Sequence, residues 1–494
     1  MDSSTVIQPQ TVPTTMPPTP DSDPARMRAV FDGQQATALR WRESTAAERI
    51  ARIKKLRGAM LAQREAFYDA FMRDYRKSPS EVEATELLPV MDEMRHAIGR
   101  VARWMKPRRV WPTSTMLGTF GSVQYQPRGR VLIVAPWNYP LSLCFGPLVS
   151  ALAAGNTVII KPSEMTPAVS ALMSRIIADV FAPSEVALFE GGLATSTALL
   201  ELPFDHIFFT GSPAVGKLVM AAAARHLSSV TLELGGKSPT IVTPSADLKL
   251  AAQTLMWGKF LNAGQTCIAP DYVYVHESVK DAFVAECRRA LQAYYGSAEH
   301  WKRTPDLTRI VNRRHTERIA GLLADALAQG AVAHTGGEVA LDQCYVTPTL
   351  LERVPLDAGV MQEEIFGPLL PILGYAELEP VIAAINARPK PLALYIFGRE
   401  RAEIRRVLAQ TSSGGACVNH CVMHFAHGNL PFGGVNNSGI GNAHGHYGFK
   451  AFSHERAVLR SSKLMAVKLF FPPFTAGRTW LIRKVVDLLR LPMP

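Results

Sequence analysis

Three short runs of consecutive apolar residues dominate the chain between residues 130 and 212. The runs RVLIVAP, GNTVIIKPS and DHIFFTGS begin at Arg130, Gly155 and Asp205. A strand that is buried on both faces of a sheet reads as a continuous apolar run, and strands that alternate with helices imply parallel pairing. We therefore predict an α/β fold with a doubly wound parallel sheet, in which the strand ends form a ligand-binding edge.

The rest of the pattern predicts covering helices, an arm and a second α/β domain. Helical periodicity with a capping-box pattern begins at Thr45 and again at Ser80. Beyond VTLELGGKSPTIV, which starts at Val230, helices again alternate with apolar runs such as DYVYVH and LLPILGY. Residues 108–129 instead combine turn residues with short β-type pieces and predict an extended, hairpin-like arm.

Composition narrows the class of protein. The 494 residues are 47% hydrophobic and 19% charged, and the net charge is +11. The length favours two or three domains, and no apolar run approaches the ~18 residues that cross a bilayer. No aromatic-and-basic module or zinc-finger spacing supports nucleic-acid binding. Six cysteines without disulfide spacing predict reduced thiols and a cytoplasmic location.

Both ends of the chain lie outside the alternating pattern. Residues 1–24 are rich in Ser, Thr, Pro and Asp and contain no Lys or Arg, which predicts a disordered tail rather than a targeting signal. Residues 463–494 include WLIRKVVDLLRL, which is compatible with an amphipathic helix. We expect this helix to pack on a partner subunit, and contact with a membrane surface is the less favoured alternative.

Glycine and charged residues follow two of the predicted strands. Gly211-x4-Gly216 opens a helix, and such a turn presents N–H groups to a phosphate, although a tightly packed helix start would need the same glycines. Lys161 and Glu164, in KPSE, can bind an anion and ribose hydroxyls. A tetrapeptide of this kind is more often only a turn.

Three further residues could carry chemistry. Asn138, between two prolines in APWNYP, can donate to a developing oxyanion or only cap a turn. Glu233 stands on an apolar strand, where desolvation would raise its pKa towards that of a general base, whereas a solvated face would give it no such role. Cys267, in GQTCIAP, is either a nucleophile on a turn or a buried structural thiol.

Seven motifs, in one order along the chain, resemble those of the aldehyde dehydrogenase superfamily. They are APWNYP, KPSE, FFTGS, LELGGKSP, GQTCIAP, EEIFGP and PFGG. FDHIFFTGS and HFAHGNLPFGGVNNSGIG are similar to the class-three and fatty-aldehyde branch, and are closest in appearance to its bacterial coniferyl-aldehyde members. The resemblance implies NAD(P)-dependent oxidation of an aldehyde to a carboxylic acid.

The resemblance also implies catalytic roles. Cys267 would attack the aldehyde and form a thiohemiacetal and then a thioester, while the Asn138 amide and the Cys267 backbone N–H would hold the oxyanion. Glu233 would deprotonate the water that hydrolyses the thioester. A non-catalytic binding or structural member of the same fold is the alternative, and retention of all three residues disfavours it.

By the same resemblance, NAD is the preferred cofactor and NADP a second one. Lys161 and Glu164 would bind the adenosine ribose, and the charge of Glu164 would repel a 2′-phosphate. The other implied cofactor residues are Gly211, Gly216, Ser212 and Trp137 near the pyrophosphate, Glu364 on the nicotinamide ribose and Phe366 beside the nicotinamide ring.

The family pattern divides the chain and suggests its partners. It implies an NAD-binding domain (25–108 and 130–232), a catalytic domain (233–441), oligomerisation elements (109–129 and 442–462) and a C-terminal extension (463–494). We expect a homodimer, because exposed strand edges seek a partner. The expected substrate is an aromatic, coniferyl-type aldehyde, and a medium- or long-chain fatty aldehyde is the alternative.

Histidines gather in the C-terminal third. His420, His424 and His427 have an H-x3-H-x2-H spacing that could mimic a zinc site, with Cys417 and Cys421 close in sequence. The family needs no metal. We therefore predict no metal site, and interpret these histidines as polar residues of a loop near the substrate mouth.

Overall fold

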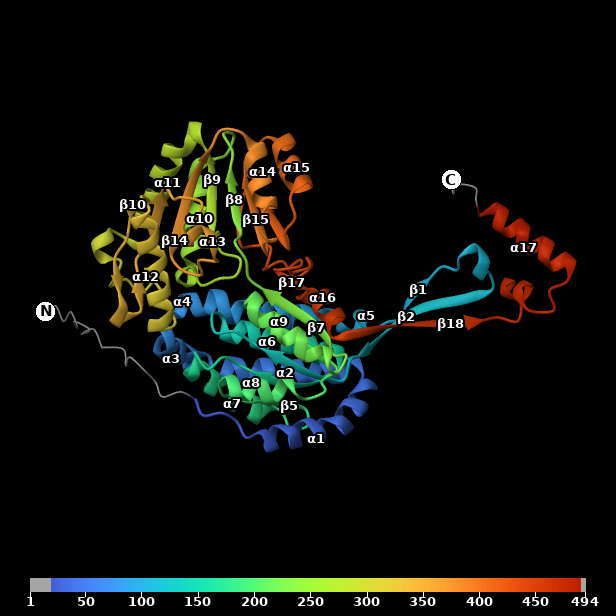
Figure 1. Ribbon diagram of the computed structural model, residues 1–494. Coiled ribbons are helices and arrows are strands. Elements are labelled where there is room, and N and C mark those ends of the chain that lie inside the picture. Colours follow the sequence, from blue (N-terminus) through green and yellow to red (C-terminus); the bar gives the residue numbers. More distant parts are fainter. Residues whose placement is uncertain (1–18, 490–494) are drawn as a thin grey trace.

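The structure, a computed structural model, describes residues 19–489, which form two α/β domains and a projecting arm (Figure 1). The first domain contains a six-stranded sheet in the order β17-β7-β6-β3-β4-β5. Its strands are β3 (Arg130–Val134), β4 (Thr157–Lys161), β5 (Val186–Leu188), β6 (His206–Gly211), β7 (Ser229–Leu234) and β17 (Gly439–Ile440). All neighbours pair in parallel except the edge strand β17, so the predicted doubly wound sheet is confirmed.

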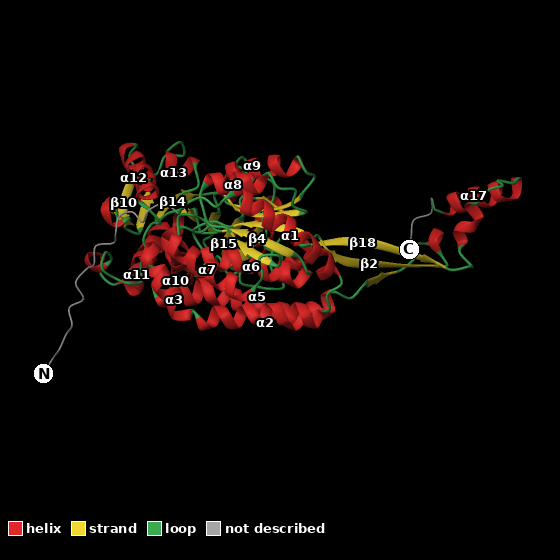
Figure 2. Ribbon diagram, turned by 90° about the horizontal axis from the view of Figure 1, so that it is seen from below, coloured by secondary structure: helices red, strands yellow, loops and turns green. Residues whose placement is uncertain are grey.

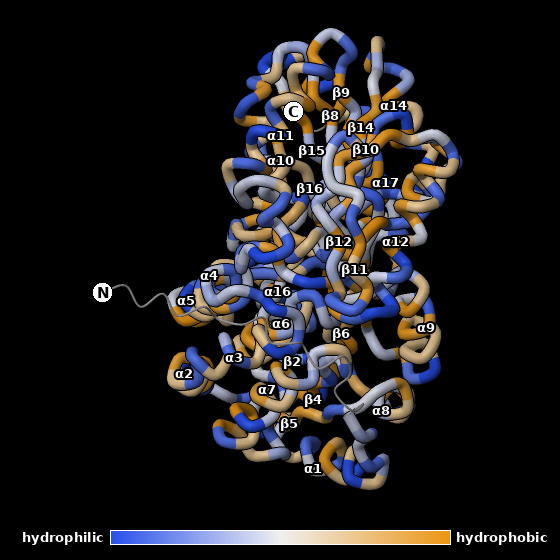
Figure 3. Tube along the Cα trace, turned by 90° about the vertical axis from the view of Figure 1, so that its left-hand side faces the viewer, coloured by the Kyte–Doolittle hydropathy of each residue, from blue (hydrophilic) through white to orange (hydrophobic). Residues whose placement is uncertain are grey.

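Helices cover both faces of this sheet. In β3, Val131 and Ile133 face one core and Leu132 faces the other, as expected of a strand that is buried on both sides. The covering helices alternate between hydrophilic and hydrophobic stretches (Figure 3). They are α1 (Pro24–Arg42), α2 (Ala46–Ala62), α3 (Arg64–Tyr75), α4 (Pro79–Val82), α5 (Leu88–Trp104), α6 (Pro140–Ala154), α7 (Pro167–Val180), α8 (Leu193–Leu200) and α9 (Pro213–Ala224).

One of the two predicted capping boxes is present. Thr45 and Glu48 cap α2 reciprocally, as predicted. The box predicted at Ser80 is wrong, because Ser78 caps α4 and Pro79 occupies its first position. A π-helical turn, Glu83–Leu87, then joins α4 to α5.

The second domain contains a seven-stranded sheet in the order β10-β13-β14-β9-β8-β15-β16, and its strands are parallel except β10. The strands are β8 (Pro239–Val242), β9 (Tyr272–His276), β10 (Val332–Thr335), β13 (Thr349–Glu352), β14 (Leu369–Tyr375), β15 (Ala393–Phe397) and β16 (Gly415–Val418). A separate pair is formed by β11 (Val339–Ala340) and β12 (Tyr345–Val346). The helices are α10 (Leu248–Phe260), α11 (Lys280–Tyr295), α12 (Arg313–Ala328), α13 (Gly359–Gln362), α14 (Leu378–Asn386) and α15 (Arg401–Gln410).

A three-stranded antiparallel arm projects from the first domain (Figures 1 and 2). It consists of β1 (Arg108–Val110), β2 (Thr119–Pro127) and β18 (Ser453–Ser461), and β2 pairs with β18 from Thr119↔Ser461 to Pro127↔Ser453. The helix predicted in the C-terminal extension is present as α17 (Ala476–Leu488), beyond the arm. No helix within residues 19–489 is both long and apolar enough to span a membrane.

The structure moves several predicted boundaries. Glu233 and Leu234 belong to β7, and β17 also joins the first sheet, so both domain limits shift by a few residues. Within the predicted oligomerisation element 442–462, α16 (Gly445–Ala451) packs into the first domain, and only β18 enters the arm.

The predicted disordered tail ends too late in the sequence. Its residues 1–18 lie outside the described part of the chain. The Asp21 carboxylate accepts hydrogen bonds from the backbone N–H groups of Gly192 and Thr195, and Ser22 donates to the Glu190 carbonyl. Since α1 begins at Pro24, residues 21–24 are already part of the first domain.

Candidate active site

The predicted nucleophile and general base line one cavity between the two domains. Asn138 precedes α6, Glu233 lies near the end of β7, and Cys267 lies on the turn between α10 and β9. Cys267 and Glu233 both line a cavity of about 420 Å³. Parallel strands end on one edge of a sheet, which brings β3 and β7 to this place.

The turn that carries Cys267 has an uncommon backbone. Asn262, Ala263 and Gly264 have φ values of +52°, +53° and +75°, in the left-handed region that favours glycine. A Cβ at Gly264 would come within 2.3 Å of the Gly367 carbonyl oxygen, so only glycine fits there. This backbone persists because its surroundings hold it.

Gln265 supplies much of that support. Its side-chain oxygen accepts from the Val311 N–H at 2.9 Å, and its amide donates to the carbonyls of Asn262 (3.0 Å) and Arg309 (3.1 Å). In the sequence, Gln265 could be noted only as part of the GQTCIAP motif, without a role of its own. No local signal could have assigned this role, because two of the three partners lie more than 40 residues away.

Asn138 is bonded to the same turn. Its side-chain amide donates to the Gln265 carbonyl at 2.9 Å, and its own carbonyl accepts from the Asn262 amide (2.8 Å) and the Tyr75 hydroxyl (3.2 Å). One N–H of the Asn138 amide therefore fixes its orientation. The second N–H of that amide can donate to an oxyanion beside the turn.

The surroundings of the Cys267 thiol disfavour its ionised form. Burial raises the pKa of Cys267 to about 12, and the negative charges of Glu364 and Glu233 act in the same direction. The backbone N–H groups of Cys267 and Ile268 oppose this shift. The Tyr395 hydroxyl donates to the Ile268 carbonyl at 2.6 Å and steadies the turn. The thiolate is therefore a minor species at neutral pH, and its formation needs a base.

Glu233 is a buried carboxyl group, as its place on an apolar strand predicted. Burial raises the pKa of Glu233 well above its usual range. Neither carboxyl oxygen has a hydrogen-bond partner among residues 19–489. Its neighbours in the sheet are Thr210 on β6 and Gly439 on β17. The raised pKa makes the carboxylate form of Glu233 a stronger base, which suits it to take a proton from a thiol or from water.

The predicted adenosine residues lie at the end of β4. Lys161 is buried, and its ammonium lies 3.2 Å from a carboxylate oxygen of Glu164, which is partly exposed. Ser212 caps α9 by accepting from the Val215 N–H at 3.4 Å. All three residues therefore face the edge formed by the strand ends.

The two glycines of this edge serve packing. A Cβ at Gly216 would lie 2.7 Å from the Leu234 side chain, and one at Gly211 would lie 2.5 Å from the Phe209 ring. The packing alternative considered for Gly211-x4-Gly216 therefore accounts for both residues.

The remaining residues of the predicted cofactor site are Trp137, Phe366 and Glu364. The Trp137 ring meets the Phe366 ring edge-to-face at 5.3 Å and also contacts His315, which sequence reasoning missed. Burial raises the pKa of Glu364 to about 8. A Cβ at Gly235 would come within 2.3 Å of the Glu364 carboxylate, so the absence of a side chain at Gly235 makes room for it.

A buried ion pair anchors the segment that contains Glu364. Lys237 pairs with Asp271 and also donates to the carbonyls of Val360 (2.9 Å) and Glu363 (2.8 Å). The Ile365 N–H donates to Asp271 at 3.0 Å. This anchor was not predicted, because its members come from three separate segments.

The cavity beyond Cys267 is mainly apolar. Residues at the start of α5 and in the loop 422–428 also line it, and among them Leu88 and Met423 are exposed. Aromatic side chains surround it, and they are Tyr139, Phe208, Trp257, Phe425, Phe432 and Phe452. Several residues of the histidine-rich loop line this cavity, but His420, His424 and His427 do not, so their place near a substrate mouth stays a prediction.

The three histidines of the H-x3-H-x2-H pattern do not converge. His424 contacts the Cys417 thiol at 3.3 Å, whereas His420 accepts from the Cys421 N–H at 2.9 Å and His427 is exposed. Within residues 19–489, no cluster of three or more His, Cys, Asp or Glu side chains could hold a metal ion.

Comparison with known proteins agrees with this arrangement. The model of the family described as "Aldehyde dehydrogenase family" matches residues 2–458. A "Probable coniferyl aldehyde dehydrogenase" of Pseudomonas aeruginosa is 42% identical over 464 residues, covering 93% of this chain and 96% of the relative. "Aldehyde dehydrogenase family 3 member A2" of Mus musculus is 39% identical over 91% of this chain and 90% of its own length.

A solved structure is also similar over nearly the whole chain. The substrate-bound state of Staphylococcus aureus AldH matches with a TM-score of 0.89 and 40% identity. The match covers 93% of this chain and 99% of that protein.

Proposed function

Because the chain belongs to the aldehyde dehydrogenase family, whose members oxidise aldehydes with NAD(P), we propose that Cys267, Asn138 and Glu233 carry this reaction here. One observation carries the proposal. Cys267 and Glu233 line one cavity, and the Asn138 amide is bonded to the turn that holds Cys267. In a non-catalytic binding or structural member of the same fold, this grouping of a thiol, a carboxyl group and an amide would have no function.

In the proposed acylation, Cys267 is the nucleophile. Its proton passes to a base, and the sulfur adds to the aldehyde carbonyl to form a thiohemiacetal. The second N–H of the Asn138 amide and the Cys267 backbone N–H hold the oxyanion, which developed from the carbonyl oxygen. With a nicotinamide dinucleotide bound as hydride acceptor, loss of hydride from the thiohemiacetal carbon would leave a thioester on Cys267.

In the proposed deacylation, Glu233 is the general base. It takes a proton from water, and the resulting hydroxide adds to the thioester carbonyl. The carbon–sulfur bond then breaks, which releases the carboxylic acid and restores Cys267. Desolvation suits Glu233 to this step, because it raises the pKa of the carboxyl group and so makes the carboxylate a stronger base.

The residues at the strand ends fit a nicotinamide dinucleotide. Lys161 and Glu164 offer a donor and an acceptor for ribose hydroxyls, and α9 begins at Pro213, after β6 of the same sheet. Buried Glu364 has a carboxyl oxygen without a hydrogen-bond partner among residues 19–489, and ribose hydroxyls can supply it. We propose that NAD is preferred to NADP, because the exposed Glu164 carboxylate would repel a 2′-phosphate.

For the substrate, we propose an aromatic aldehyde of the coniferyl type. The ring of aromatic side chains around the cavity supports this choice, as does the name of the Pseudomonas relative. A medium- or long-chain fatty aldehyde is the second candidate. The exposed apolar side chains at the cavity mouth, Leu88 and Met423, favour it, because they would cover a chain that extends outward.

A kinetic panel tests the activity and the choice of substrate. With NAD in excess, kcat/KM for coniferyl aldehyde should exceed that for benzaldehyde and that for decanal, since differential transition-state binding sets this ratio. Reduced cofactor is followed by its absorbance. Highest activity with decanal would favour the fatty-aldehyde alternative, and no oxidation of any aldehyde would contradict the proposed function.

We also propose a cytoplasmic homodimer. All six cysteines are free thiols, as expected in a reducing compartment. The arm carries apolar side chains in water, including Trp111 (95% exposed), Phe120 and Leu459, and β18 ends its sheet with an open edge. Such an edge is suited to pairing with a second copy.

Light scattering tests the dimer. The wild-type protein should have the mass of two chains, whereas Leu459→Asp should have the mass of one, because the new charge lies on the open edge. Leu408→Asp, on the exposed face of α15, is the matched control and should remain dimeric. A single-chain mass for the wild type at micromolar concentration would contradict the proposal.

A further inference from the structure

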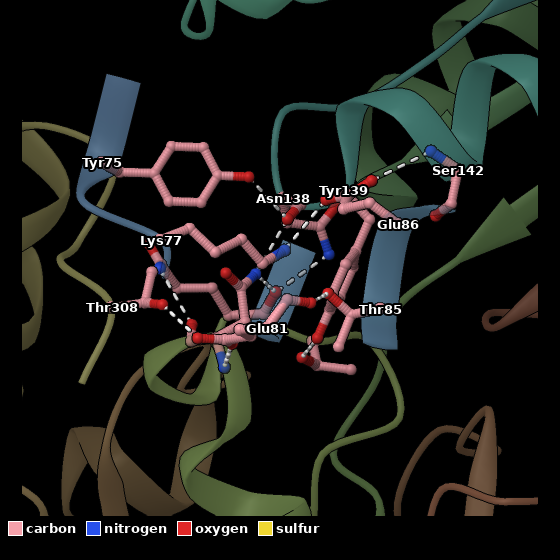
Figure 4. A network of polar contacts seen from close by, with 12 residues as sticks. Tyr75, Lys77, Glu81, Thr85, Glu86, Asn138, Tyr139, Ser142 and Thr308 are labelled. Carbon is pink, nitrogen blue, oxygen red and sulfur yellow. Dashed lines mark hydrogen bonds and ion pairs between the residues drawn. The ribbon is translucent and has the colours of Figure 1, made fainter. Parts of the chain in front are cut away.

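One carboxylate of the first domain reaches the nucleophile turn of the second. Glu81, on α4, accepts from the Asn262 backbone N–H at 2.6 Å with one carboxylate oxygen. Its other oxygen accepts from the Thr308 hydroxyl at 2.5 Å (Figure 4). Both donors belong to the second domain. Glu81 therefore ties the two domains together at the point where the turn begins.

The hydrogen bond to Glu81 is donated by Asn262, a residue whose backbone conformation needs support. Asn262 is the first residue of the left-handed run that leads to Cys267, and a non-glycine residue in this region is stable only when several contacts hold it. The Asn262 side chain donates in turn to the carbonyls of Asn138 (2.8 Å) and Gln265 (3.3 Å). A shift of Asn262 would thus move both the nucleophile turn and the oxyanion donor.

The helix that carries Glu81 is itself held firmly. Lys77 and Glu86, on either side of it, form an ion pair at 2.9 Å whose side chains are fully buried. Glu86 also accepts from the Ser142 N–H at 3.0 Å, at the start of α6. Lys77 lies 4.3 Å from the centre of the Tyr139 ring, and the Tyr139 hydroxyl bonds to Thr266 at 2.6 Å (Figure 4). The short helix α4, which carries Glu81, is therefore held in place on both sides.

We propose that Glu81 is a positioning residue for the reaction, and that Thr308 orients its carboxylate. Together they hold Asn262 in the left-handed conformation and so set the distance between the Cys267 sulfur and the Asn138 amide. This inference rests on the roles proposed above for Cys267 and Asn138. Misplacement of a reacting group by about 1 Å can cost about 10²-fold in rate, so the effect of losing this contact should be measurable.

Thr308 gives the cleanest test, because its hydroxyl can be removed without a change of shape. Thr308→Val should lower kcat about tenfold and slow the alkylation of Cys267 by iodoacetamide by a similar factor, with the KM for NAD within twofold of wild type. Thr308→Ser keeps the donor and should restore both rates. Glu81→Gln should lower kcat by about tenfold or more, because the amide keeps only one acceptor oxygen for the two hydrogen bonds. Glu83→Gln, which removes a surface partner of Arg64, should change neither rate.

The outcomes separate a positioning role from a merely structural one. If Thr308→Val lowers the melting temperature but leaves kcat and the Cys267 alkylation rate at the wild-type values, the proposal is overturned. Equal effects of Thr308→Val and Thr308→Ser would overturn it as well. If Glu81→Gln does not fold, the two Thr308 variants still decide. Failure of the proposed function is distinguishable, because either the wild-type protein would then oxidise no aldehyde or Cys267→Ala would remain active.

Discussion

Cys267→Ala should abolish aldehyde oxidation, with turnover reduced by about 10⁴-fold or more, because loss of a covalent nucleophile removes the whole reaction path. The other five thiols cannot replace it. Cys144, Cys287 and Cys421 are buried in the cores, and Cys344 and Cys417 do not line the cavity. The measurement is steady-state formation of reduced nicotinamide with coniferyl aldehyde. Substantial residual turnover would mean that another thiol acts.

Cofactor binding provides the control for this variant. Cys267→Ala should bind NAD with a Kd within about twofold of wild type, since none of the predicted nucleotide residues lies on the nucleophile turn. The same titration tests cofactor preference, and the Kd for NADP should be the higher one. Cys344→Ala, on a thiol outside the cavity, should keep full activity.

Glu233→Gln should separate the two halves of the reaction. The amide keeps the shape of the side chain but cannot take a proton from water, so steady turnover should fall by about 10²- to 10⁴-fold. The first turnover should suffer less, and a burst close to one reduced nicotinamide per active site should precede a slow phase. Mass spectrometry should find the acyl group on the Cys267 peptide. The absence of both burst and adduct would mean that Glu233 is needed first to activate the thiol.

The pH dependence follows from the environment of Glu233. Burial raises the pKa of its carboxyl group, so at a given pH a smaller fraction of Glu233 is ionised and able to act as a base than for an exposed glutamate. Wild-type deacylation should therefore become faster as the pH rises towards that pKa. In Glu233→Gln this rise should disappear from the slow phase. If both proteins show the same pH profile in the slow phase, another group is the base.

The regular parts of the fold could be predicted because their signals are local. The runs at 130–136, 155–163 and 205–212 became β3, β4 and β6, since a strand buried on both faces needs apolar side chains at every position. The start of α4 was misplaced by two residues, because Ser78 and Ser80 carry the same capping signal and only Pro79 decides between them. The disordered tail was predicted to extend to residue 24, which is too far. The hydrogen-bond partners that order Asp21 lie about 170 residues away in sequence and give no local signal.

The candidate site likewise has a part that could be predicted from the sequence and a part that could not. Cys267, Glu233 and Asn138 stand in motifs, so a resemblance could identify them. The contacts that orient them do not follow from any motif. Asn262 and Ala263 take left-handed conformations without being glycines, and the carboxylate that supports them is 181 residues away in sequence. Only the packed structure relates such positions.

The chain leaves its first domain and returns to it, and this has a consequence for how the protein is made. Residues 235–438 are synthesised as one continuous piece between β7 and β17, and Phe449 and Phe452 then complete the core of the first domain. Phe208 is synthesised early, and its ring stacks on that of Phe452 with 5.5 Å between the ring centres. On the ribosome, the second domain can finish folding while the first still exposes apolar surface. The domain that begins first is therefore the last to close, and it needs protection for most of the time of translation.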